Sequence, residues 1–168
     1  MLFPSNHIAY LLLGGNQGDR PSMLKQARSL LADQVGLIRA QSALYESEPW
    51  GFDTSNCFVN QAICIQTRLE PLDLLNACLD IERSIGRIRP ENAVGYTSRI
   101  IDIDIIFYDH QVIDLPTLVV PHPRMHLRRF VLRPLADIAS AYIHPKIGVS
   151  VGELLDGCTD TNGVWPYL

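Results

Sequence analysis

GYTSRIIDIDIIF, residues 95–107, is the stretch of this sequence that decides the fold. Its isoleucines are β-branched and its last residue is aromatic, which is typical of a β-strand. Because side chains alternate between the two faces of a strand, one apolar set is expected to share a face: Ile101, Ile103, Ile105 and Phe107. The same alternation predicts that Asp102 and Asp104 lie together on the opposite face.

Asp102 and Asp104 are candidate metal ligands. Their Cα atoms are expected to lie roughly 6–7 Å apart, given a rise of about 3.3 Å per residue. Magnesium usually takes one or two carboxylates together with phosphate oxygens and water, so this pair suits a metal–nucleotide site. The alternative is a strand with one wet face on which both aspartates are simply solvated.

Length and composition favour one globular domain over residues 1–168, since the chain has 168 residues of which 47% are hydrophobic. The net charge of −4 argues against a nucleic-acid-binding surface. No apolar run approaches the roughly 20 residues that span a bilayer, and no secretory signal precedes the first strand. The four cysteines form no C-x-x-C motif and no zinc spacing, which indicates reduced thiols in a cytoplasmic protein.

The order of the expected elements indicates an α+β fold. Strands are expected at residues 7–13, 37–46, 58–67 and 99–107, with helices from Asp19, a candidate N-cap, to Asp33 and from Pro71 to Gly86. This β-α-β-β-α-β order is the ferredoxin-like arrangement, an antiparallel sheet with both helices on one face. The other face, or the edges and loops, would then accept a ligand. Residues 125–138, interrupted by Pro134, are a further helix candidate among the C-terminal additions.

Glu82 lies near the middle of the apolar arc of the second helix, in line with Leu75. A carboxylate in that position must be paired or hydrogen-bonded, because an isolated buried charge is costly. Two interpretations remain open: a structural pair with an arginine, or contact with a bound nucleotide.

Basic and aromatic side chains are expected near the aspartate pair. The positive groups suit a polyphosphate and are Arg87, Arg89, Arg99, Arg124, Arg128 and His122. The loop after the second strand carries Trp50 and Phe52, which hint at a binding surface. Carboxylates for magnesium, arginines for phosphates and aromatics for a flat ring together indicate a phosphoryl-transfer enzyme that uses ATP.

These residues also carry a family resemblance. The chain resembles the 6-hydroxymethyl-7,8-dihydropterin pyrophosphokinase family, in which pyrophosphate moves from ATP to a pterin alcohol in folate biosynthesis. The similarity runs from YLLLGGNQGD, residues 10–19, to FVLRPL, residues 130–135. Its central motifs are GRIR at 86–89, SRIIDID at 98–104 and PHPR at 121–124.

The resemblance implies a role for each matching residue. Asp102 and Asp104 would bind two magnesium ions with ATP, while Arg87 and Arg99 would assist the transfer. The implied nucleotide-binding residues are Glu82, Arg89, Tyr96, Ile105, His122 and Arg128. The implied pterin-binding residues are Ser47, Trp50, Phe58, Asn60 and Phe130, with the two phenylalanines sandwiching the ring. Residues 46–57 and 87–98 are expected to close over both ligands.

Two other functions remain open at this point. A palm-type nucleotidyltransferase also places paired carboxylates on strands for two metals, and only the acceptor and products would separate it. A non-catalytic ferredoxin-like module that binds RNA or a small regulator should carry a basic face, which the negative net charge disfavours. The expected partners are therefore ATP and the pterin, with no nucleic acid and no membrane, in a monomer or weak homodimer.

Overall fold

The computed structural model describes residues 5–49, 56–86 and 100–168. The main strands are β1 (His7–Gly15), β2 (Gly36–Gln41), β3 (Tyr45–Ser47), β4 (Phe58–Thr67), β5 (Asp102–Tyr108) and β8 (Val164–Pro166). They form one sheet in the order β5-β1-β4-β3-β8, with β2 also pairing β4. Every pairing in this sheet is antiparallel. A separate hairpin consists of β6 (Ile113–Asp114) and β7 (Val119–Val120).

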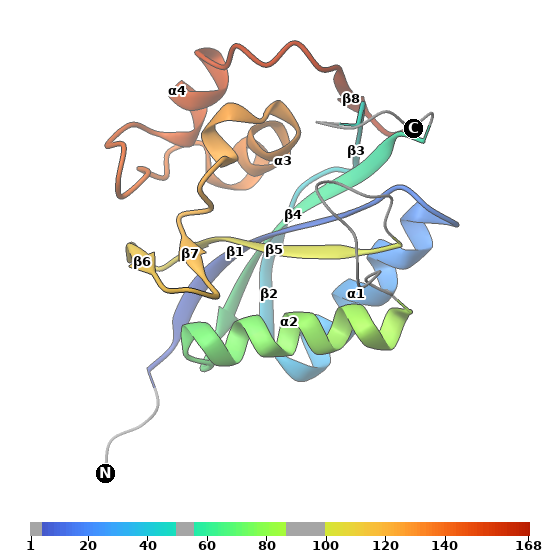
Figure 1. Cartoon of the computed structure of the whole chain (residues 1–168), viewed down its shortest axis with the longest axis vertical. Helices are drawn as coiled ribbons and strands as arrows, with labels where there is room; N and C mark the ends of the chain where they lie inside the picture. Colours follow the sequence, from blue (N-terminus) through green and yellow to red (C-terminus); the bar gives the residue numbers. More distant parts are fainter. Residues whose placement is uncertain (1–4, 50–55, 87–99) are drawn as a thin grey trace.

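The helices lie on both sides of the sheet (Figure 1). One side carries α1 (Arg20–Gln34) and α2 (Pro71–Ile85), and the other carries α3 (Arg129–Ala139) and α4 (Val151–Asp156). A short 3₁₀ turn, η1 (Met125–Leu127), precedes α3. The β1-α1-β2/β3-β4-α2-β5 order confirms the ferredoxin-like α+β fold predicted from the sequence. Within the described residues, no helix is both long and apolar enough to cross a membrane.

The predicted N-cap of α1 and both predicted ends of α2 are confirmed. The Asp19 side chain accepts a hydrogen bond from the Ser22 backbone N–H and caps α1. Helix α2 begins at Pro71 and ends at Gly86, whose φ of 112° is left-handed and therefore suits glycine. These caps fix where each helix starts or stops relative to the sheet.

The expectation that Phe107 shares a face with Ile105 was wrong. Tyr10 pairs with Phe107 but Leu11 pairs with Ile105, so one extra residue, Ile106, forms an irregularity in β5. The bulge reverses the alternation, so Phe107 packs in the α3–α4 core whereas Ile105 packs in the α1–α2 core. Before the bulge, the predicted alternation of Asp102, Ile103 and Asp104 holds.

The predicted second strand, residues 37–46, is two strands in the structure. β2 ends at Gln41 and β3 starts at Tyr45, and both pair with β4. Between them the Ser42 hydroxyl accepts a hydrogen bond from the Ala62 backbone N–H at 2.9 Å. A side chain therefore replaces a backbone acceptor here, which breaks the regular ladder and lets β3 start a new register.

Helix α3 covers much of the sheet face that the sequence left for a ligand. Val131, Leu132 and Leu135 pack against Leu12 and Ala62 of the sheet. Its first helical residue is Arg129, four residues later than expected, and Pro134 lies inside it. The predicted helix is thus confirmed in type, and it occupies part of the sheet face that was expected to be free for a ligand.

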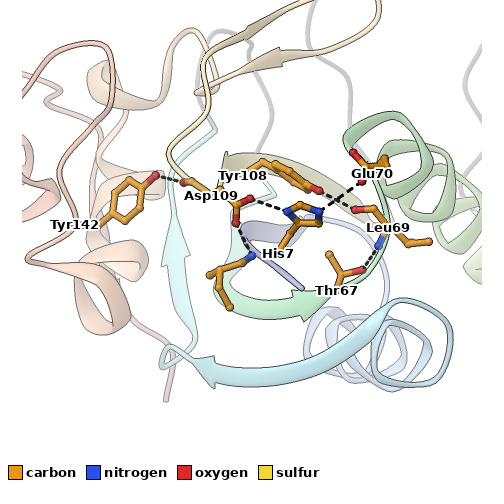
Figure 2. Close-up of polar contacts among 8 residues, drawn as sticks. His7, Thr67, Leu69, Glu70, Tyr108, Asp109 and Tyr142 are labelled. Atoms are coloured by element: carbon orange, nitrogen blue, oxygen red, sulfur yellow. Dashed lines mark hydrogen bonds and ion pairs between the residues drawn. The ribbon is translucent and has the colours of Figure 1, made fainter. Parts of the chain in front are cut away.

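Asp109 joins three segments at the end of β5, at the far end of that strand from Asp102 (Figure 2). Its carboxylate lies 2.7 Å from His7 Nδ1 and accepts the Ile8 backbone N–H at 2.8 Å. Its own carbonyl oxygen accepts a hydrogen bond from the Tyr142 hydroxyl. Asp109 has a φ of 48°, a conformation that Asp tolerates better than most residues. These contacts join the start of β1, the end of β5 and the segment after α3.

His144 should make stability depend on pH. Burial, with the nearby His126 charge as a second cause, lowers the pKa of His144 below 6.5. Its Nδ1 accepts backbone N–H groups from Lys146 and Ile147, which requires the neutral ring. The folded state then binds fewer protons than the unfolded state, so stability is lost as the pH falls below 6.5. We expect His144→Asn, which keeps an acceptor, to flatten this loss in urea unfolding between pH 7 and 5. An unchanged slope would contradict it.

Candidate functional site

The carboxylates of the candidate site lie on the sheet face that carries α3. Asp102 pairs with Gly14 and Asp104 pairs with Leu12 on the neighbouring strand β1. Ile103, between them, is buried in the α1–α2 core, so the two aspartates point to the opposite face. Both carboxylate residues are half-buried, and β5 is the terminal strand of the sheet. The predicted shared face is therefore confirmed.

Glu82 contacts the backbone between the two aspartates. Its Oε1 accepts a hydrogen bond from the Ile103 N–H at 3.0 Å, and the residue is only 2% exposed. Because β5 is at the edge of the sheet, this N–H points away from β1 and needs an acceptor from elsewhere. Glu82 of α2 supplies it and thereby fixes the strand that carries both carboxylates.

Several acidic side chains belong to this part of the structure. Burial, together with the charges of Glu82 and Asp104, raises the pKa of the Cys78 thiol to about 12. Carboxylates of this kind would attract a divalent cation. Among residues 5–49, 56–86 and 100–168, no three His, Cys, Asp or Glu side chains form a metal cluster. Two carboxylates fit magnesium, which completes its shell with phosphate oxygens and water.

His122 and Arg128 belong to the segment that follows β7. The His122 backbone N–H donates to the Ile106 carbonyl of β5 at 3.0 Å. Burial lowers the pKa of His122, the Asp102 charge raises it and Arg124 lowers it, which places the ring near both charges. Arg128 is 6% exposed, and burial lowers its pKa while Asp160 opposes the change. The structure therefore places His122 against β5, where the charge of Asp102 acts on its ring.

The predicted pterin residues Ser47 and Asn60 contact each other. Asn60 Nδ2 donates to Ser47 Oγ at 2.7 Å, and both side chains are almost fully buried. Asn60 also pairs with Gly14, which pairs on its other side with Asp102. Asn60 of β4, Gly14 of β1 and Asp102 of β5 thus form one row of paired residues across three neighbouring strands.

Gly14 leaves room for the Asn60 side chain in this row, a role that was not predicted from the sequence. A Cβ at Gly14 would lie 2.7 Å from Asn60 Oδ1, closer than side chains tolerate. A glycine inside a strand is itself a signal of close approach, and it was present in the sequence.

Phe58 and Phe130 lie on the α3 side of the sheet and are both half-buried. Phe58 precedes Asn60 by two residues on β4 and so shares its face. Phe130 is in the first turn of α3, where the Arg128 guanidinium lies 5.8 Å from the centre of its ring. The Ile105 side chain is 6% exposed and packs in the α1–α2 core, so a nucleotide contact by this residue would have to come from its backbone.

Five predicted site residues lie outside the described residues: Trp50, Arg87, Arg89, Tyr96 and Arg99. The expected closure of residues 46–57 and 87–98 also falls largely outside them. Arg124 is described, and its backbone N–H donates to His122 Nδ1 at 3.4 Å.

A ferredoxin-like sheet that carries paired carboxylates, with a half-buried imidazole, a guanidinium and an amide on nearby elements, fits the class of phosphoryl-transfer enzymes. The family comparison narrows this class. Residues 10–140 match the family model of 7,8-dihydro-6-hydroxymethylpterin-pyrophosphokinase. The chain belongs to this family of pyrophosphokinases of folate biosynthesis, which transfer pyrophosphate to hydroxymethyldihydropterin.

Individual relatives agree with the family model. The chain is 41% identical over 140 residues to a 2-amino-4-hydroxy-6-hydroxymethyldihydropteridine pyrophosphokinase of Porphyromonas gingivalis, covering 83% of this chain and 95% of the relative. It is 41% identical over 134 residues to the enzyme of the same name from Bacillus subtilis, covering 79% and 78%. It is also 34% identical to the folic acid synthesis protein fol1 of Pneumocystis carinii, of which it spans only 22%.

Solved structures show the same fold. A crystal structure of wild-type Plasmodium falciparum HPPK-DHPS with pteroate superposes with a TM-score of 0.73 at 16% identity. The match covers 90% of this chain, which spans 44% of the solved chain. At this identity, the likeness supports the ferredoxin-like fold alone.

Proposed function

We propose that this chain uses ATP as the donor, transfers its pyrophosphate to the hydroxymethyl oxygen of 6-hydroxymethyl-7,8-dihydropterin and releases AMP. The observation that carries the proposal is the row Asp102–Gly14–Asn60, which joins a carboxylate strand to a buried amide pair. This row would place the phosphate chemistry next to a recognition site for a flat heterocycle.

Asp102 and Asp104 are the residues that would hold magnesium, two ions with ATP in our proposal. When bound, magnesium would neutralise phosphate charge and stabilise the attacking and leaving oxygens. Glu82 contributes by holding the Ile103 backbone, so that both carboxylates keep their direction. Preorganisation of this kind matters because phosphoryl transfer depends mainly on positioning and charge neutralisation.

His122 and Arg128 would bind nucleotide phosphates. The lowered pKa of His122 keeps the ring neutral at pH 7, so it would donate or accept a hydrogen bond and would not act as a fixed charge. Arg128 stays a cation, since arginine ionises only at very high pH. In the same proposal Arg87 and Arg99 assist transfer, while Arg89, Tyr96 and the Ile105 backbone contact the nucleotide.

Asn60 and Ser47 would recognise the pterin edge. An amide matches the paired donor and acceptor of a pyrimidinone, and the Ser47 contact fixes which way the Asn60 amide faces. Phe58 and Phe130 would stack on the ring, with Trp50 lining the pocket. No general base is assigned, and in-line attack on the β-phosphorus needs no covalent intermediate.

The reaction is tested by incubating the chain with ATP, magnesium and the pterin. AMP should appear one-for-one with pterin diphosphate, and omission of the pterin or addition of a magnesium chelator should stop it. Release of ADP would indicate a simple kinase, and release of free pyrophosphate would indicate a nucleotidyltransferase. Either product pattern would contradict the proposal.

Gly14→Ala should weaken pterin binding selectively. The new methyl group would displace Asn60 Oδ1 and break its alignment with Ser47, which costs about one hydrogen bond or roughly tenfold in the KM for the pterin. Stability should change little, because the displaced atom is at the end of a side chain. Steady-state kinetics with each substrate varied in turn measures this. An equal rise in the KM for ATP would contradict the role of Asn60.

We also propose that residues 1–168 act as one pyrophosphokinase domain in the cytoplasm, as a monomer or weak homodimer. The pairing of β8 with β3 supports the single domain, because the C-terminal strand completes the sheet. All four cysteines are free, which fits a reducing compartment.

A further inference from the structure

Strand β3 is a short element that carries Ser47, one of the proposed pterin residues. It has three residues, Tyr45–Ser47, and lies between β4 and the C-terminal strand β8 (Figure 1). On the α3 side, the Tyr45 hydroxyl donates to the Asp137 carboxylate at 2.9 Å and Ser47 contacts Asn60. Three residues provide few backbone hydrogen bonds, so the position of Ser47 depends on what holds β3 from its other face and its outer edge.

Arg20 holds β3 from the other face. Glu46 points away from Tyr45 and Ser47, and its Oε2 lies 2.7 Å from Arg20 Nη1. The same Nη1 donates to the Cys57 carbonyl oxygen at 2.9 Å, directly before Phe58. One guanidinium at the start of α1 therefore contacts β3 and the residue that precedes β4.

The C-terminal strand completes this contact. Trp165 Nε1 donates to Glu46 Oε1 at 3.0 Å, and Arg20 lies over the Tyr167 ring at 5.6 Å. The Glu48 carboxylate accepts the Gly163 backbone N–H at 2.7 Å at the other end of the pairing. Both oxygens of Glu46 are thus used, one toward α1 and one toward β8.

We propose that Arg20, Glu46 and Trp165, called here the β3 brace, position Ser47 and Phe58 for the pterin and so set the affinity for that substrate. The inference rests on the pterin placement proposed above. The brace lies on the sheet face opposite Asn60, so its members act through Ser47 and Phe58 and are positioning residues. It gives the C-terminal residues a role in substrate binding that their sequence did not indicate.

The brace is suited to mutation because it is not part of either core. The side chains of Arg20 and Glu46 are 24% and 23% exposed, and both line a cavity of about 560 Å³. Conservative changes there leave no buried void, so folding should survive. Their effect should appear in substrate affinity, since a looser β3 must be ordered again each time the pterin binds.

Three variants separate the contacts. Arg20→Lys keeps the charge but cannot reach Glu46 and Cys57 with the same geometry. Glu46→Gln keeps the acceptor for the indole, and Trp165→Phe removes the indole donor while keeping a smaller aromatic ring. We expect each to raise the KM for the pterin by about three- to tenfold, with kcat and the KM for ATP within about twofold of wild type. Exposed Arg68→Lys is the matched control and should change none of these values.

The outcomes separate the inference from the function on which it rests. If wild type makes pterin diphosphate and the brace variants keep its KM for the pterin, the positioning role is wrong and the proposed function stands. If the variants lower only the urea midpoint of unfolding, the brace is purely structural and the inference is also wrong. If wild type forms no pterin diphosphate, both the function and the inference fail. A double-mutant cycle of Arg20→Lys with Glu46→Gln should show less than additive effects on the KM.

Discussion

Asp104→Asn is expected to lower turnover by about 10²–10³-fold while the protein stays folded. Loss of one carboxylate from the pair would remove a few kcal/mol of charge stabilisation in the transfer, and about 1.4 kcal/mol corresponds to a factor of ten. Asp104 is half-buried, and asparagine keeps its size and one acceptor oxygen. The free energy of unfolding should therefore change little. Asp102→Asn should behave in the same way.

Turnover and urea unfolding should be measured on the same preparations. Asp114→Asn is the control, because Asp114 is an exposed acid on the β6–β7 hairpin. Raising the magnesium concentration should recover part of the activity of Asp104→Asn if the carboxylate binds the ion. Full activity in either site variant at ordinary magnesium concentrations would refute the metal assignment.

Glu82→Leu is the second change with a large expected effect, and it should lower both stability and turnover. It leaves the Ile103 N–H without its acceptor at a buried position, which costs about 1–3 kcal/mol of unfolding free energy. Loosening this backbone also disturbs the directions of Asp102 and Asp104, so the magnesium concentration needed for half-maximal turnover should rise several-fold.

Glu82→Gln distinguishes the two roles that the sequence left open. Glutamine keeps an oxygen for the Ile103 N–H, so stability should stay close to wild type. If turnover also stays close, Glu82 acts by fixing the strand. If Glu82→Gln weakens ATP binding at unchanged stability, the carboxylate itself serves the nucleotide. A Glu82→Leu variant with wild-type stability and magnesium dependence would show that neither role is correct.

The local periodicity of the sequence was sufficient to predict most of the fold. The alternation in β4, the caps of α1 and α2 and the shared face of Asp102 and Asp104 each depend on neighbours within a few residues. The bulge at Ile106 was not predictable, because it is defined by the register of β5 against Tyr10 and Leu11. The break at Ser42 likewise depends on a contact with Ala62, twenty residues away.

The same distinction applies to the site. Glu82 was identified as anomalous because the helical period places it on an apolar arc. Its hydrogen-bond partner could not be predicted, because the Ile103 N–H is available only if β5 is the terminal strand of the sheet. Arg20 and Glu46 look like ordinary surface charges in the sequence. Their importance comes from the pairing of β3 with β8, which joins residues more than a hundred positions apart.

The fate of the β-phosphorus of ATP tests the central claim most directly. ATP labelled at that atom, incubated with magnesium, the pterin and this chain, should give label on the pterin and unlabelled AMP. This result follows only if the pterin oxygen attacks the β-phosphorus and the pyrophosphate moves as one unit. Label in ADP or in free pyrophosphate, with none on the pterin, would contradict the account.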